Sequence, residues 1–176
     1  MSFNGSAESV PARHVAVTER AIHPDSERLI RLLRESDSAT RTLAAWTGGP
    51  VLLEVVDRHD DRLSATEFAD LDLWRPEPVQ RRKIRLLDNR DRVLSEATAT
   101  VVLGRVPYRT ALALRDGDMP LGLLLAPLHP KRHTLSVVRG SGDQPDSPLF
   151  DITARLDVGG SPVAFVRERY LPQVLL

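Results

Sequence analysis

Cysteine is absent from this chain of 176 residues, and lysine is almost absent. Without cysteine the chain has no disulfide, no thiolate zinc site and no cysteine nucleophile. Lysine occurs only as Lys83 and Lys131, so nearly every cation is an arginine. The planar guanidinium of arginine binds carboxylates through two parallel hydrogen bonds, which suits recognition of an acidic small molecule.

An excess of charge of either sign is also absent, because 24 lysines and arginines balance 24 aspartates and glutamates. A neutral chain has no broad basic field for phosphate backbones or acidic membrane surfaces. No apolar run approaches the roughly 20 residues that a membrane helix needs, and residues 1–17 lack the apolar stretch of a secretory signal. We therefore expect a cytoplasmic protein with no nucleic-acid partner and no membrane partner.

The order of apolar segments and turn signals predicts one α+β domain over residues 19–176, after a flexible arm over residues 1–18. Hairpin turns are expected at residues 88–91 and 159–160, and they favour an antiparallel sheet. One helix is expected to begin at Pro24, and three others are expected at residues 39–46, 106–115 and about 120–127. Residues 58–78 look irregular. Six strands are expected, at residues 51–56, 79–87, 93–103, 134–138, 149–158 and 163–171.

Two charged residues stand in otherwise apolar rows of these strands. Alternate side chains of a strand point to opposite faces. Glu168 therefore shares its face with Ala164, Val166 and Tyr170, while the flanking arginines point away. Arg82 in the same way shares its face with Gln80, Ile84 and Leu86. If both rows face the core, the chain buries a cation and an anion, and each needs a partner.

Two interpretations of this couple remain open from the residues alone. In the first, Arg82 and Glu168 pair with each other as a structural salt bridge. In the second, they line an enclosed pocket, where Arg82 binds a substrate carboxylate and Glu168 accepts a proton or a hydroxyl hydrogen bond. Strand alternation alone favours neither of them.

Several segments, in order, resemble the chorismate lyase family and its actinobacterial branch. Residues 36–43 (SDSATRTL) resemble a helix start of the family, and residues 82–86 (RKIRL) resemble one of its strands. Residues 120–125 (PLGLLL) resemble its Pro-Leu-Gly segment, and residues 168–172 (ERYLP) its closing motif. Residues 95–97 (SEA) also resemble a strand of that branch, though imperfectly. The likeness implies a six-stranded antiparallel sheet with short helices that encloses a buried ligand pocket.

The resemblance also implies an activity, the cofactor-independent elimination of pyruvate from chorismate to give 4-hydroxybenzoate. Ligand contacts of the family fall at the positions of Arg82, Leu121 and Glu168. Arg82 would pair with the ring carboxylate, and Glu168 would bind the ring hydroxyl, either as a base or only as a hydrogen-bond acceptor. Leu121 and the backbone at Gly122 would pack on the ring, although Leu121 also fits an ordinary core residue.

Three more positions belong to this expected site. Thr40 would help to hold a carboxylate at the start of its helix, or it is a plain helix-start residue. Arg132 would supply a second cation, or it lies at a solvated strand end. Ala39 stands where some family members have a ligand-contacting Met, which would widen the pocket. Residues 152–154 (ITA) replace a basic stretch of some members, which would weaken recognition of a dicarboxylate.

These departures leave two alternatives to a chorismate lyase. One is a biosynthetic enzyme of natural-product metabolism that uses the same scaffold on another substrate. The other is a non-catalytic small-molecule-binding module, because a related fold serves as the effector-sensing domain of transcription regulators. The few residues before Leu32 argue against a helix-turn-helix in the same chain. The five histidines are scattered, so we expect no metal site, and the sequence predicts no oligomeric state.

Overall fold

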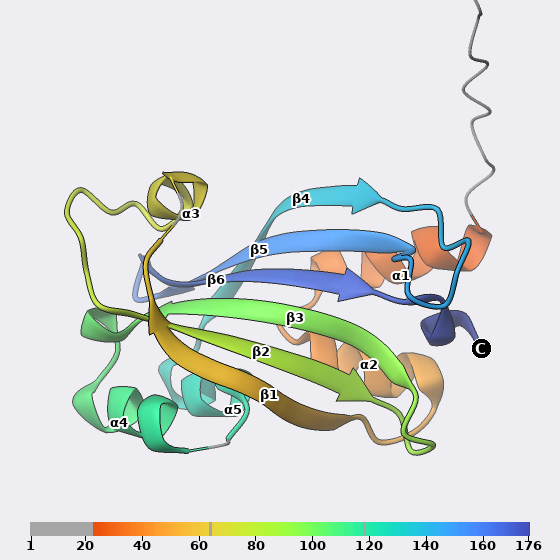
Figure 1. Cartoon of the computed structure of the whole chain (residues 1–176), viewed down its shortest axis with the longest axis horizontal. Coiled ribbons are helices and arrows are strands. Elements are labelled where there is room, and N and C mark those ends of the chain that lie inside the picture. Colours follow the sequence, from red (N-terminus) through yellow and green to blue (C-terminus); the bar gives the residue numbers. More distant parts are fainter. Residues whose placement is uncertain (1–22, 64, 118) are drawn as a thin grey trace, which may run out of the picture.

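Six antiparallel strands form one sheet in the order β1-β2-β3-β6-β5-β4, as Figure 1 shows. This arrangement comes from a computed structural model that describes residues 23–63, 65–117 and 119–176. The predicted fold class, an α+β domain with a six-stranded antiparallel sheet and short helices, is confirmed. The strands are β1 (Leu52–Asp61), β2 (Val79–Leu87), β3 (Val93–Val102), β4 (Lys131–Arg139), β5 (Phe150–Val158) and β6 (Ser161–Tyr170).

Short helices connect the strands, and the local sequence explains where they begin and end. The helices are α1 (Pro24–Glu35), α2 (Ala39–Thr47), α3 (Ala65–Asp70), α4 (Tyr108–Asp116) and α5 (Leu121–Leu125). Pro24 starts α1 without loss of a hydrogen bond, and the Ser38 hydroxyl caps α2 by accepting from Arg41 N at 3.3 Å. Gly48 ends α2 in the left-handed conformation at φ 68°, which glycine adopts without strain.

Strand alternation gives the sheet two different faces. We call the inner face the one that carries Arg82 and Glu168, and the outer face the one that carries Arg81 and Arg167. The predicted inner rows of β2 and β6 lie on the inner face, and both charged residues are buried there. The predicted alternation of these two strands is therefore correct.

Two apolar clusters cover the inner face, one toward each end. Near α4 and α5, Leu114, Leu121 and Leu125 pack with Ala99 and Val166. The second cluster lies near α1 and α2 and joins Leu29, Leu33 and Leu43 with Leu86, Phe150, Ile152 and Tyr170. Figure 1 shows these two helix pairs at opposite ends of the sheet. The boundary between the clusters is called the seam below.

The segment between β1 and β2 differs most from the prediction. Residues 58–61 continue β1 instead of leaving the sheet, and residues 65–70 form α3. A third apolar cluster holds this region against one end of the outer face, where Leu71 and Leu73 pack with Val79 and Phe165. The continuation of β1 was missed because its charged side chains face solvent, and α3 was missed because it is short and charged.

Both edge strands of the sheet carry a register irregularity. In β1 it lies between Val55 and Asp57, and in β4 it lies between Thr134 and Ser136. The residues that bulge out, Val56 and Leu135, are exposed. Each irregularity interrupts the outward row of backbone hydrogen-bonding groups on its strand.

None of the helices in the described ranges is long and apolar enough to span a membrane. The predicted arm, residues 1–18, lies outside the described residues. The predicted domain begins at residue 19, so its first four residues lie outside the described ranges as well.

Candidate functional site

Glu168 lies at the seam of the inner face. Its neighbours on the same face of β6 are Val166, which belongs to the α4–α5 cluster, and Tyr170, which belongs to the α1–α2 cluster. Across the strands it pairs with Ala97 of β3 and Ile152 of β5. A carboxylate in this apolar setting requires partners, because its desolvation is not offset by the surrounding side chains.

Arg132 and Tyr170 are the partners that the structure supplies. The Arg132 Nη2 donates to Glu168 Oε2 at 2.6 Å, and the Tyr170 hydroxyl donates to the same oxygen at 3.0 Å. The Arg132 Nη1 donates to the Leu33 carbonyl in the last turn of α1 at 2.9 Å. The Arg132 side chain is only 4% exposed, so the alternative of a solvated strand end is wrong.

Tyr170 is the most buried member of this group. Its ring stacks on Phe150 with 4.7 Å between ring centroids. Burial raises the pKa of Tyr170 well above its ordinary value, and the negative charge of Glu168 adds to the rise, while Arg132 opposes it. The phenol therefore stays protonated and donates to the carboxylate.

Arg82 lies on the inner face but does not pair with Glu168. Its Nη1 donates to the Met119 carbonyl at 3.1 Å, and its Nη2 donates to the Gly117 carbonyl at 3.3 Å. Arg58, its register partner on β1, donates to the same Gly117 carbonyl. Arg82 thus connects the sheet to the segment between α4 and α5, and the first interpretation, a direct salt bridge with Glu168, is wrong.

The other predicted site residues lie in different environments. Leu121 packs in the α4–α5 cluster with Ala97 and Ala99, so it is a core residue on the inner face. Ala39 packs partly against the α1–α2 cluster. Thr40 is half-buried, with no side-chain hydrogen bond to another described residue. Gly122 is exposed, and a Cβ added there would meet no atom within 4 Å.

Gln80 is an inner-face residue that sequence reasoning did not select. It lies two residues before Arg82 on β2 and is buried at 3% exposure. Its Oε1 accepts no hydrogen bond from any residue in the described ranges. The same alternation that singled out Arg82 also placed Gln80 on this face, but an uncharged amide gave no reason to expect a site.

Solvent reaches the seam from the side of the α4–α5 cluster, to which Val166 and Leu121 belong. Val166 and Glu168 each retain 8% exposure and Leu121 retains 9%, whereas Ile152 and Tyr170 have none. Both hydrogen bonds to Glu168 end on Oε2, so Oε1 accepts none from the described residues. The network therefore fixes a carboxylate at the seam and leaves one of its oxygens available.

A much wider hollow lies away from these residues. It has a volume of about 1150 Å³ and is open to solvent between α1, α2, the β2–β3 hairpin and the C-terminal residues. Charged side chains of both signs line it, including Arg28, Glu35, Arg41 and Asp88. None of the predicted site residues borders it.

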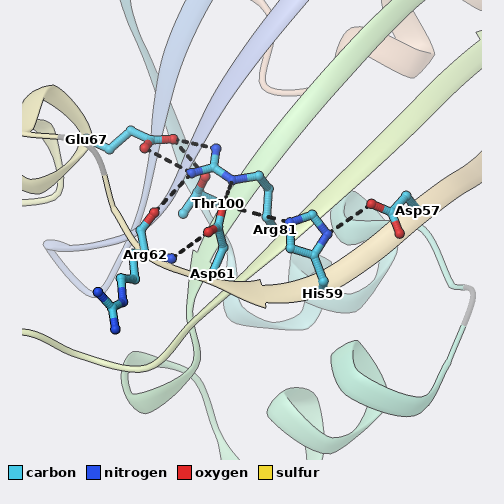
Figure 2. Close-up of polar contacts among 7 residues, drawn as sticks. All are labelled: Asp57, His59, Asp61, Arg62, Glu67, Arg81 and Thr100. Atoms are coloured by element: carbon cyan, nitrogen blue, oxygen red, sulfur yellow. Dashed lines mark hydrogen bonds and ion pairs between the residues drawn. The ribbon is translucent and has the colours of Figure 1, made fainter.

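A separate polar network on the outer face holds α3 in place (Figure 2). Glu67 accepts from Arg81 Nη1 at 2.8 Å and from the Thr100 hydroxyl at 2.9 Å. Arg81 also pairs with Asp61 at 2.6 Å, and His59 lies beside Asp57 at 2.9 Å. No group of three acidic or histidine side chains within the described ranges could hold a metal ion. We interpret this network as structural.

Comparison with known proteins gives structural neighbours only. No family model and no curated protein matches the chain. It is similar to the effector domain of PhnF from Mycobacterium smegmatis, with a TM-score of 0.58 and 14% identity over 77% of this chain and 89% of that domain. It is also similar to the ligand-binding domain of a GntR-family transcriptional regulator from Bordetella bronchiseptica, with a TM-score of 0.52 and 19% identity over 69% of this chain and 85% of that one.

These neighbours correct the functional prediction. The prediction that the chain belongs to the chorismate lyase family is wrong, and so is the prediction of a lyase acting on chorismate, because the similar structures are regulator domains. The matching motifs have structural explanations: Pro120 precedes α5, Leu121 is core and Glu168 is paired with Arg132. What the comparisons establish is a fold shared with ligand-binding domains of GntR-family regulators.

Proposed function

We propose that this chain is a non-catalytic small-molecule-binding domain whose ligand lies along the seam of the inner face. The observation that carries the proposal is the Arg132–Glu168–Tyr170 network, which anchors Glu168 through Oε2 and leaves Oε1 available. A carboxylate oxygen held in a fixed position is a strong acceptor for a hydroxyl or N–H group of a ligand. Arg132 acts here as a positioning residue, because its guanidinium already binds Glu168 and the Leu33 carbonyl.

The second anchor in this proposal is Arg82, which is only 1% exposed and donates to the Met119 and Gly117 carbonyls, so the ligand would replace these carbonyls as its acceptor. Two strand spacings and two residues along the chain separate it from Glu168, which corresponds to roughly 12 Å between their Cα atoms. Between them the inner face carries Ala97, Ala99 and Val166, which share a cluster with Leu121 and Leu125, so a ligand here would displace these two leucines. A ligand with a hydrogen-bond donor at one end and an anionic group at the other fits this span.

This proposal keeps a small carboxylate as the ligand class and replaces turnover with binding. The shared fold supports it, since the similar structures include an effector domain and a ligand-binding domain. A shared fold alone does not carry function, so the residues at the seam are the basis of the test. The absence of a nucleic-acid partner stays a prediction.

The test uses three probes of matched length: 6-hydroxyhexanoate, hexanoate and hexanol. We expect only 6-hydroxyhexanoate to raise the melting temperature, because only it has both a donor and a carboxylate. Arg82→Met should abolish the rise, and Glu168→Gln should weaken it, whereas Arg139→Met on the edge strand should not change it. Equal responses to all three probes, or full binding by the Arg82→Met variant, would contradict the proposed site.

A further inference from the structure

A shallow hollow of about 400 Å³ lies on the outer face of the sheet, on the side opposite the seam. Its lining includes four cations, Lys83, Arg85, Arg167 and Arg169, and two carboxylates, Glu96 and Asp151. No helix residue belongs to its lining, and α3 lies toward one end of the sheet (Figure 1). An uncovered and positively charged hollow in the middle of a sheet needs an explanation that packing does not give.

The charges in this hollow fall into two groups. Arg85 pairs with Glu96 at 3.1 Å, and Arg169 pairs with Asp151 at 3.5 Å, so these four neutralise one another. Lys83 forms no ion pair with any residue in the described ranges. The same is true of Arg167, whose guanidinium lies 5.9 Å from the centre of the Phe165 ring.

Thr98 lies directly between these two cations. In the sheet register it pairs with Lys83 of β2 on one side and with Arg167 of β6 on the other. Two strand spacings separate the cations, or roughly 10 Å between Cα atoms, so their long side chains can converge over Thr98. The Thr98 hydroxyl forms no hydrogen bond with another described residue.

The acidic residue nearest to Lys83 in the sheet register already has another partner. Asp57 is the β1 partner of Lys83, but its carboxylate lies 2.9 Å from His59 Nδ1, as Figure 2 shows. The site therefore combines an ammonium, a guanidinium and a hydroxyl, while the two carboxylates of the hollow, Glu96 and Asp151, are each paired with another arginine.

We propose that this hollow binds a compact phosphate-type anion through Lys83, Thr98 and Arg167. Three donors of different shape match a tetrahedral group with several oxygen atoms better than a planar carboxylate, and two cations match a double charge. The anion is the phosphate group of a small molecule or inorganic phosphate. The site goes beyond the proposed seam site, because it uses the opposite face of the sheet and different residues.

The test is a titration of the full chain with inorganic phosphate and with phenyl phosphate at constant ionic strength, followed by calorimetry and by the NMR signal of the Thr98 methyl. Acetate serves as the planar, singly charged comparison. We expect both phosphates to shift the Thr98 signal and to bind at least roughly fivefold more tightly than acetate. Stronger binding of phenyl phosphate would identify an organic phosphate as the natural source, whereas equal binding would identify phosphate itself.

Matched variants separate a built site from a diffuse positive field. Lys83→Met, Arg167→Met and Thr98→Val should each weaken phosphate binding about fivefold. Thr153→Val is the control for Thr98→Val, because Thr153 also pairs with Arg167 but does not line the hollow. Arg139→Met is the control for loss of one charge, and neither control should change affinity. Equal weakening in the controls, or acetate binding as tightly as phosphate, would overturn the proposal.

Discussion

Arg132 on β4 and Glu168 on β6 form an ion pair at 2.6 Å across the intervening strand β5. The pair also reaches α1, because Arg132 donates to the Leu33 carbonyl. One arginine therefore links two non-adjacent strands and a helix at the place where the two apolar clusters meet. This relationship explains how a carboxylate is kept on the buried side of the sheet.

Loss of Arg132 should be strongly destabilising. In the Arg132→Met variant, Glu168 would stay buried without its cation, and the expected loss is about 3–5 kcal/mol in the free energy of unfolding. The double variant Arg132→Met/Glu168→Gln should recover part of this loss, because no buried charge remains. Urea unfolding measures both. A single variant within about 0.5 kcal/mol of the parent would show that the pair is not the anchor we describe.

The attachment of α3 should depend on Glu67. Its carboxylate binds Arg81 and Thr100 and is only 6% exposed. Glu67→Gln should cost about 1.5–3 kcal/mol and speed amide hydrogen exchange in residues 65–70 before the rest of the chain. Glu54→Gln, which changes an exposed carboxylate beside Arg85, is the control and should change stability by less than about 0.5 kcal/mol. If Glu67→Gln speeds amide exchange no more in residues 65–70 than in the rest of the chain, Glu67 does not hold α3 in place.

Acid should weaken the fold partly through Asp88 in the β2–β3 hairpin. Burial alone would raise the pKa of Asp88, but the backbone N–H groups of Arg92 and Arg90 and the Arg92 guanidinium hold it below its ordinary value. A carboxyl group whose pKa is lowered by folding stabilises the protein above its ordinary pKa, and this contribution disappears as pH falls through the lowered value.

Asp88→Asn tests this because it keeps the Oδ1 acceptor and removes the charge. The variant should lose less stability than the parent between about pH 4 and pH 2. Urea midpoints measured across that range give the comparison. Asp146→Asn, in an exposed loop position, should leave the acid dependence as it is in the parent. If the two variants behave alike, Asp88 does not contribute.

Alkaline titration should report on Tyr170. The chain has two tyrosines, so Tyr108→Phe leaves Tyr170 as the remaining one. Because folding raises the pKa of Tyr170, the phenol stabilises the protein below its ordinary pKa, and this contribution is lost as pH rises through the raised value. Phenolate absorbance should therefore appear well above the ordinary pKa and together with unfolding, as circular dichroism would record. Earlier absorbance with the fold intact would contradict the buried network.

Replacement of Gly140 and of Gly122 by alanine should have different effects on stability. A Cβ on Gly140 would collide with the Pro148 carbonyl oxygen, so Gly140→Ala should cost about 1–3 kcal/mol. Gly122 is in α5 with open space around it, so Gly122→Ala should be neutral or stabilise by up to about 1 kcal/mol. Thermal unfolding of both variants tests the pair. A damaging Gly122→Ala substitution would point to a contact that the fold does not explain.

Short-range sequence patterns correctly predicted part of the fold. Turn residues predicted the β2–β3 hairpin, and the alternation of apolar residues predicted the inner rows of β2 and β6. The cation that pairs with Glu168 could not be found in this way, because Arg132 is 36 residues away in sequence and one strand removed in the sheet. Alternation identified a buried charge but could not identify its partner.

Motif resemblance predicted the scaffold correctly and the chemistry wrongly. In this structure Leu121 is a core residue and Glu168 is paired with Arg132, so both have structural roles. The segment around α3 was missed because it is short and charged, and because Glu67 becomes buried only when Arg81 and Thr100 approach it from other strands. The burial of Glu67 depends on partners from other strands, so no pattern within residues 65–70 could predict it.

The bulges at Val56 and Leu135 have a consequence for how this chain meets other molecules. An incoming strand aligned on either outermost strand would lose register at the bulge and would gain only short ladders on each side of it. Fibril-like growth by strand addition is therefore disfavoured at both ends of the sheet. Both sites proposed above lie instead on the broad faces, where side chains rather than backbone groups would determine what is bound.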